Sequence, residues 1–146
     1  MSEANGVTDP VDIVHAMWRD IDLNDGRKAH EWYLPDGTLT FDQRTSHGQD
    51  EIAATYEKRR SGTARVARHV AANISREVVD DTTVRVYSIV VLYAGNGAVP
   101  LPNVNPAMVG DVFDVFVREG GTWLLQSRTI TTIFIAPETV LGVPTK

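Results

Sequence analysis

Apolar positions in the first part of the chain recur at the spacing of an amphipathic helix. From Val11 to Ile21 they return every three or four residues, which places them on one face of a helix. The preceding "TDP" supplies Thr8 or Asp9 as a helix cap and Pro10 as a favourable first residue. The pattern therefore predicts a first helix that begins at residue 10 and ends at "DLNDG".

Three further short segments follow before residue 62. "RKAHEWYL" predicts a second, short helix closed by the turn signal "PDG". "TLTF" predicts a short strand, and "RTSHG" predicts a loop. "QDEIAATYEKRRS" predicts a third helix, capped near Gln49 or Asp50, that turns Ile52, Ala53 and Tyr56 inward.

After Gly62 the pattern becomes that of β-strands. Four segments are rich in Val, Ile, Thr and aromatic residues and alternate in part, namely residues 64–79, 83–94, 109–118 and 122–135. The breaks "DDT" and "EGG" are short enough for hairpins, so these strands should run antiparallel. Residues 95–106 contain three prolines and two glycines, which indicates a long loop.

Helices followed by a long strand meander predict an α+β fold. We expect the N-terminal helices to pack in a strongly curved antiparallel (mixed) sheet, which gives a cone-shaped α+β barrel. Strands of this length must bend, and a bent sheet with helices across its mouth can enclose a pocket. Residues 1–9 are expected to form a flexible N-terminal tail and residues 10–146 a single domain, which is long enough to bury a substantial core.

Composition narrows the class of protein. The 146 residues are 42% hydrophobic and 23% charged, which is typical of a soluble globular protein. No apolar run reaches the length of a membrane span, and the polar N-terminus lacks the layout of a signal peptide. No cysteine occurs, so disulfides and thiolate chemistry are excluded. A net charge of −5 without a basic block argues against nucleic acid and anionic membranes as partners, and a cytoplasmic location is expected.

Small and polar residues share one face of the first long strand, in "RVARHVAANISREVV". Ala67, His69, Ala71 and Asn73 alternate, so an imidazole and an amide lie beside two alanines. Such a face either meets solvent or lines a cavity in which polar groups are needed and bulk is not. An imidazole changes its charge near neutral pH, which suits a general base.

The chain resembles a known family over roughly residues 10–136. "DIDLNDGRKAHEWYLPDGTLTF", "RHVAAN" and "GDVFDVFVREGGTWLLQSR" are similar, in their order and spacing, to the SnoaL-like branch of the nuclear transport factor 2-like superfamily. Members include scytalone dehydratase, lindane dehydrochlorinase, ketosteroid isomerase and polyketide cyclases. Nuclear transport factor 2 and the small subunit of ring-hydroxylating dioxygenases share the fold without such catalysis, so the fold alone does not imply a reaction.

In the dehydratase and dehydrochlorinase members, an aspartate just after the first helix pairs with a histidine on the first long strand. The resemblance places these residues at Asp22, in "DIDLND", and His69, in "ARHVAAN". This sequence departs from scytalone dehydratase at two positions. Ile21 stands where that enzyme has a tyrosine beside the aspartate, and its second active-site histidine falls near Tyr93 or Ala94.

The resemblance implies a cofactor-independent acid–base enzyme, a dehydratase, isomerase or cyclase-like lyase, acting on a small hydrophobic substrate in a conical pocket. Asp22 and His69 would be its catalytic pair. One alternative is a non-catalytic ligand-binding or subunit-type member of the same fold. Another is an epoxide-hydrolase-like hydrolase with an Asp–Arg–Asp cluster. No cofactor is expected, and the histidines at positions 15, 30, 47 and 69 lack the spacing of metal ligands.

Further residues are candidates for contact with substrate. Asn73 and Tyr93 are possible polar helpers. Asp114 and Arg128 should pair across neighbouring strands, either as a structural salt bridge or with Arg128 polarising a substrate carbonyl or receiving a leaving anion. Aromatic residues are expected in the core, with some lining the pocket; they include Trp18, Phe41, Tyr56, Phe113 and Phe134.

A homodimer is expected, because the superfamily often pairs outer sheet faces. The alternating apolar positions of residues 83–94 would otherwise be exposed in a monomer; they are Val84, Val86, Val90 and Leu92. These residues face the helices in the alternative interpretation.

Overall fold

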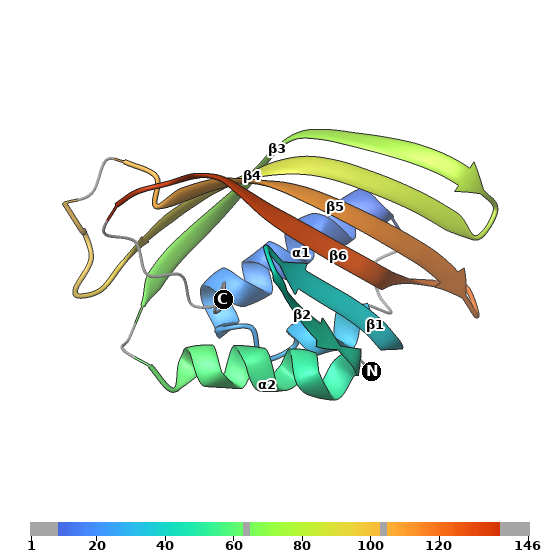
Figure 1. The fold of residues 1–146 in the computed structure, drawn as a ribbon, viewed down its shortest axis with the longest axis horizontal. Helices are drawn as coiled ribbons and strands as arrows, with labels where there is room; N and C mark the ends of the chain where they lie inside the picture. The colour runs from blue at the N-terminus through green and yellow to red at the C-terminus, as the bar shows by residue number, and fades with distance from the viewer. Residues whose placement is uncertain (1–8, 63–64, 103–104, 138–146) are drawn as a thin grey trace.

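A computed structural model of the chain describes residues 9–62, 65–102 and 105–137. One six-stranded sheet, in the order β2-β1-β6-β5-β4-β3, arches over two α-helices that both lie on its concave side (Figure 1). The elements run along the chain as α1 (Pro10–Asn24), η2 (Ala29–Trp32), β1 (Tyr33–Phe41), β2 (Arg44–His47), α2 (Gly48–Arg60), β3 (Val66–Asp80), β4 (Thr83–Gly95), β5 (Met108–Glu119) and β6 (Thr122–Ile135).

The sheet is mixed, as the sequence predicted. Strands β3 to β6 form an antiparallel meander, whereas β1 pairs with β6 in parallel and with β2 in antiparallel orientation. The long strands curve strongly, and on the concave side α1 packs against β3 and β4 while α2 packs against β1 and β2 (Figure 1). The expected α+β cone is therefore confirmed.

Helix α1 begins and ends as its sequence predicts. Asp9 is the N-cap and its side chain accepts a hydrogen bond from the Val11 N–H at 2.8 Å, with Pro10 at the first helical position. At the other end Asp25 takes the left-handed conformation with φ 55°, and the Gly26 N–H closes the last turn on the Asp20 carbonyl at 3.1 Å. The apolar stripe of the helix is buried against the sheet.

Several local predictions before residue 62 are wrong. "RTSHG" is not a loop, because Arg44–His47 form β2 and pair with the end of β1. "PDG" does not end a helix; it lies inside β1, where the pairing with β6 shifts register between Tyr33 and Thr38. The second helix is a single 3₁₀ turn. The turn expected at "PDG" is thus an irregularity within β1, at the point where the pairing with β6 is interrupted.

The inner face of the sheet forms the core together with the helices. The apolar residues of β4 that were expected to lie outside in a monomer are buried here, at 1–4% exposure: Val84, Val86, Val90 and Leu92. That argument for a homodimer is therefore wrong, and the alternative, that they face the helices, is right. Phe113 and Phe134 were expected in the core, but they are exposed at 51% and 69%.

Register shifts explain the misplaced side chains of β3 and β6. The β3–β4 pairing shifts between Ala72 and Ser75, and Asn73 within this bulge has φ 50°. A bulge inserts one residue and reverses which face the following residues occupy. The β5–β6 pairing also shifts, between Val115 and Phe116, and beside this shift Leu125 is buried while Gln126 is exposed.

Among the described residues, no helix is both long and apolar enough to span a membrane. The proposed tail of residues 1–9 falls outside the described residues except for Asp9, and so do the last residues of the proposed domain, 138–146.

Candidate functional site

Asp22 and His69 are in direct contact. One carboxylate oxygen of Asp22 lies 2.6 Å from His69 Nδ1, and the other accepts the backbone N–H of His69 at 2.8 Å. Both side chains are nearly buried, with 8% of Asp22 and 10% of His69 exposed. The structure thus brings together two residues that lie 47 positions apart in the sequence.

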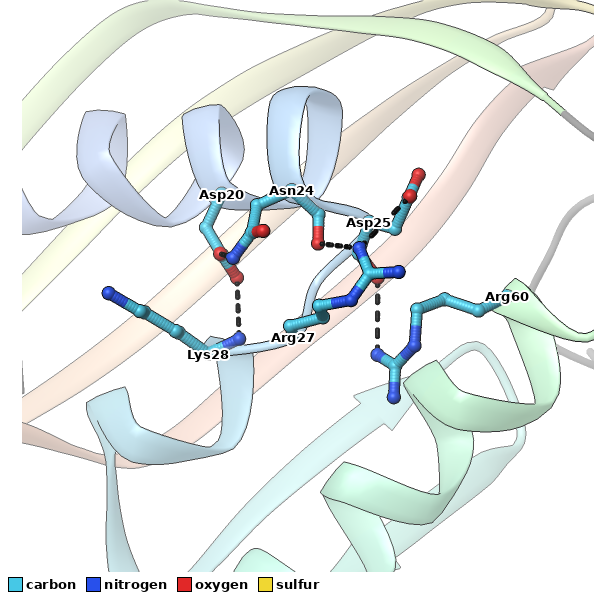
Figure 2. A network of polar contacts seen from close by, with 6 residues as sticks. All are labelled: Asp20, Asn24, Asp25, Arg27, Lys28 and Arg60. Carbon is cyan, nitrogen blue, oxygen red and sulfur yellow. Dashed lines mark hydrogen bonds and ion pairs between the residues drawn. The ribbon is translucent and has the colours of Figure 1, made fainter.

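The end of α1 is fixed firmly around Asp22. The buried Asp20 carboxylate accepts the Asn24 side-chain amide at 2.8 Å and the Lys28 N–H at 3.1 Å (Figure 2). Arg60 of α2 donates to the Asp25 carbonyl at 3.3 Å (Figure 2). Asp20 and Asp25 therefore have structural roles. Asp22 lies between them and points toward β3.

Gly26 allows α2 to approach this helix end. A Cβ atom at Gly26 would lie 2.6 Å from Cδ1 of Tyr56, and the residue has φ +72°, a conformation that favours glycine. The approach brings Tyr56 to the lining of the pocket described below. Because Tyr56 is buried, its pKa is raised, so it remains a neutral hydroxyl.

Trp18 holds the His69 ring from one side. It lies one helical turn before Asp22, so both side chains are on the same face of α1. The two rings are stacked, with centroids 4.4 Å apart and planes inclined by 8°. The Arg128 guanidinium lies 4.6 Å from the Trp18 ring. The imidazole is therefore restrained by a carboxylate, by its own backbone and by an aromatic ring.

A narrow, mostly apolar pocket opens beside His69. Its empty volume is about 510 Å³ including the open mouth, but only about 40 Å³ has room for the centre of a water molecule. Three of the expected pocket residues, Trp18, Phe41 and Tyr56, line it together with His69. The remaining lining residues are Ile21, Leu39, Arg59, Arg65, Val90, Leu92, Met108 and Ile130.

The pKa of His69 is lowered below its ordinary value of 6.5, chiefly because burial disfavours the charged ring. The hydrogen bond and negative charge of Asp22 act in the opposite direction. The positive charges of Arg59 and Arg65 lower the pKa further. The outcome is an imidazole that is neutral at pH 7 and able to accept a proton.

Asp114 and Arg128 pair across β5 and β6, as predicted. The guanidinium donates from Nε and Nη2 to the two carboxylate oxygens at 2.8 and 2.9 Å, and both side chains are almost wholly buried. Burial alone would lower the pKa of Arg128, but the Asp114 carboxylate overrides this and holds the pKa above its ordinary value. Neither residue lines the pocket, and Asp114 is the single carboxylate paired with Arg128 among the described residues.

Two expected helpers do not reach the pocket. Asn73 was expected on the face of His69, but the bulge turns it outward and it is exposed. Tyr93 is 39% exposed, because it alternates with the buried Leu92 and so points to the convex face. Both assignments to substrate binding are therefore corrected.

Arg59 and Arg65 line the pocket, although the sequence did not single them out. They belong to the cationic stretch "EKRRSGTAR", which resembles the usual basic end of a helix. That cluster of charges was the available signal. Among the described residues, no three His, Cys, Asp or Glu side chains are placed to hold a metal ion together.

Solved structures of other proteins have the same fold. ActVI-ORFA from Streptomyces coelicolor is 20% identical, with a TM-score of 0.72 over 84% of this chain and 92% of that one. A candidate scytalone dehydratase from Novosphingobium aromaticivorans is 18% identical, with a TM-score of 0.74 over 98% and 95%. A cystatin-like protein of unknown function from Nostoc punctiforme is 17% identical, with a TM-score of 0.72 over 94% and 96%.

Sequence comparison gives the family directly. No curated protein sequence matches the chain. The family model for the SnoaL-like domain matches residues 8–129, which is most of the chain. The chain therefore belongs to the SnoaL-like family of nuclear transport factor 2-like folds, whose members include polyketide cyclases and dehydratases.

Proposed function

We propose that this protein is a cofactor-independent acid–base enzyme, a lyase or isomerase of the dehydratase or cyclase type, that acts on a small hydrophobic substrate. The observation that carries the proposal is the 2.6 Å contact between Asp22 and His69 Nδ1 beside a narrow apolar pocket. Family membership supports the reaction class, since dehydratases and polyketide cyclases belong to the same family.

The hydrogen-bonding partners of His69 indicate which ring nitrogen would act as the base. An ionised carboxylate can only accept hydrogen bonds, so the ring hydrogen of neutral His69 resides on Nδ1, facing Asp22. Nε2 then carries the lone pair, and it has no protein partner among the described residues. Because His69 lines the pocket, Nε2 is the atom that would take a proton from bound substrate.

Asp22 and Trp18 would stabilise the imidazolium that forms. The carboxylate is close enough to offset the new positive charge, and the stacked indole face attracts a cation. The imidazolium would then return the proton, either to a departing hydroxyl group in an elimination or to a different carbon in an isomerisation. The neutral Tyr56 hydroxyl, from the pocket wall, is a possible donor to a substrate oxygen.

Proton abstraction can be tested without knowledge of the natural substrate. Phenylacetone combines a small apolar ring with acidic C–H groups beside a carbonyl, and in D₂O a general base exchanges these hydrogens for deuterium. Proton NMR should show faster exchange with the protein than with buffer alone. His69→Gln should lose this acceleration, while the control His15→Gln, at an exposed position on α1, should keep it.

The outcome separates catalysis from binding. If phenylacetone binds but the protein does not accelerate exchange, or if His69→Gln exchanges as fast as the unmodified protein, the acid–base proposal fails. A role in ligand binding would then be the better interpretation of the pocket.

A further inference from the structure

We propose that the substrate is anionic, a small hydrophobic carboxylate whose charged group binds Arg59 at the mouth of the pocket, beside Arg65, while its apolar part lies against Trp18 and His69. This inference names the substrate class of the site and rests on the proposed function only for the reaction at His69. It can be tested by binding alone.

The lining of the pocket has an unusual charge for this chain. The whole sequence carries a net charge of −5, yet the charged side chains of the described lining are Arg59 and Arg65, without any carboxylate. The rest of the lining is apolar except for His69 and the Tyr56 hydroxyl. An apolar pocket whose lining carries two arginines and no carboxylate is complementary to a hydrophobic acid.

Arg59 is available to such a ligand. Within the described part of the chain, no carboxylate lies at ion-pair distance from Arg59, which is half-buried on the last turn of α2. Other arginines do have carboxylate partners: Arg27, Arg76, Arg85 and Arg128. Arg65 is a second cation in this lining, and burial and the charge of the nearby Arg59 both lower its pKa.

A second hollow adjoins the pocket, since Ile21, Arg59 and Arg65 line both. Its two carboxylates are already engaged: Asp22 by His69, and Asp25 by Arg27 at 3.2 Å. Arg59 and Arg65 are partly exposed, and the second hollow forms a polar vestibule beside them. An incoming carboxylate would meet them before the apolar interior.

Binding of an anion would also change the strength of the base. The positive charges of Arg59 and Arg65 lower the pKa of His69, whereas Asp22 raises it. A carboxylate bound to Arg59 would offset part of the positive field. The pKa of His69 would then rise, so the imidazole would become a stronger base only when substrate is present.

The test compares three ligands that share a phenyl ring: benzoate, benzamide and phenyl phosphate. Amide chemical shifts in NMR titrations of the full chain give each dissociation constant at low salt. We expect benzoate to bind at least about tenfold more tightly than benzamide and to weaken as salt is added. Arg59→Gln should remove this preference, and Arg85→Gln should keep it, because Arg85 is an exposed residue paired with Glu77.

The possible results are decisive in both directions. Equal binding of benzoate and benzamide, a preference that survives Arg59→Gln, or no binding of benzoate would overturn the proposal. Tighter binding of phenyl phosphate than of benzoate would replace the carboxylate with a phosphate ester. If benzoate binds through Arg59 but the protein does not accelerate exchange of phenylacetone, the proposed catalysis is refuted and this inference stands. If the protein accelerates exchange but benzoate does not bind through Arg59, this inference is refuted and the proposed catalysis stands.

Discussion

Replacement of Asp22 by asparagine keeps the shape of the side chain but changes the hydrogens that face His69. One oxygen of Asp22 accepts the His69 backbone N–H at 2.8 Å, and the other faces Nδ1 at 2.6 Å. The backbone N–H can only donate, so the asparagine carbonyl must stay against it and the NH₂ group must face Nδ1. Nδ1 must then accept, and the ring hydrogen moves to Nε2. The proposed base would lose its lone pair.

The expected effects on stability and activity differ widely. Both hydrogen bonds remain in neutral form, and a charge-assisted bond is about twice as strong as a neutral one that contributes about 1 kcal/mol. Asp22→Asn should therefore lower the free energy of unfolding by about 1–2 kcal/mol. A correctly placed general base contributes about 10²- to 10⁴-fold to a rate, so deuterium exchange of phenylacetone should fall by about this factor.

Two measurements on the same sample decide the matter. Long-range ¹H–¹⁵N NMR correlations of the histidine rings identify which nitrogen carries hydrogen, and His69→Gln assigns the signals. The unmodified protein should show hydrogen on Nδ1, and Asp22→Asn should show it on Nε2. Hydrogen that remains on Nδ1 in the variant would refute the hydrogen-bonding argument. A shifted hydrogen together with an unchanged exchange rate would refute the role of Nε2 as the base.

Three further predictions concern stability and assembly. The folded protein lowers the pKa of His69 below the unfolded value of about 6.5, so the unfolded state binds more protons as pH falls through 6.5. The free energy of unfolding should thus decline below pH 6.5, by up to about 1.4 kcal/mol per unit, and urea unfolding of His69→Gln should show a shallower decline. Asp114→Ala leaves the buried charge of Arg128 without its partner and should cost about 3–5 kcal/mol in urea unfolding, with the partly exposed Asp111→Ala costing far less. The convex sheet face carries half-exposed Val70 and Phe113, and no described helix covers it, so we propose that a second copy of the chain covers this face. Analytical sedimentation should show a dimer for the unmodified protein and a monomer for Phe113→Lys. A monomeric unmodified protein would contradict this proposal.

The sequence predicted those elements whose signals are local. In helix α1 the apolar stripe, the capping residue and Pro10 all indicate the same helix, and its observed limits match the prediction. The long strands agree to within about two residues because hairpin turns and β-branched residues mark their ends. The pairing of Asp114 with Arg128 was predicted correctly, and the two residues lie opposite each other on the adjacent strands β5 and β6.

Predictions failed where position depends on the register between distant strands. One inserted residue in the β3 bulge was enough to move Asn73 out of the pocket, and simple alternation cannot reveal such an insertion. The parallel pairing of β1 with β6 likewise has no local signal. The antiparallel pairing with the end of β1 makes "RTSH" a strand where a loop was expected. Arg59 lines the pocket from α2, and the close approach of α2 to the turn after α1 requires the absence of a side chain at Gly26.

The alanines on either side of His69 now have a physical explanation. Ala67 is buried and Ala71 packs against the core, on the same inward face of β3 as His69, and α1 packs across this part of the strand. Alanine is a poor strand former, so its use here is not favoured by intrinsic propensity. Larger side chains at these positions would hold α1 farther from the sheet, and a shift of about 1 Å would break a hydrogen bond of 2.6 Å. The small residues therefore permit the close approach on which the stacking of Trp18 and the contact of Asp22 with His69 both depend.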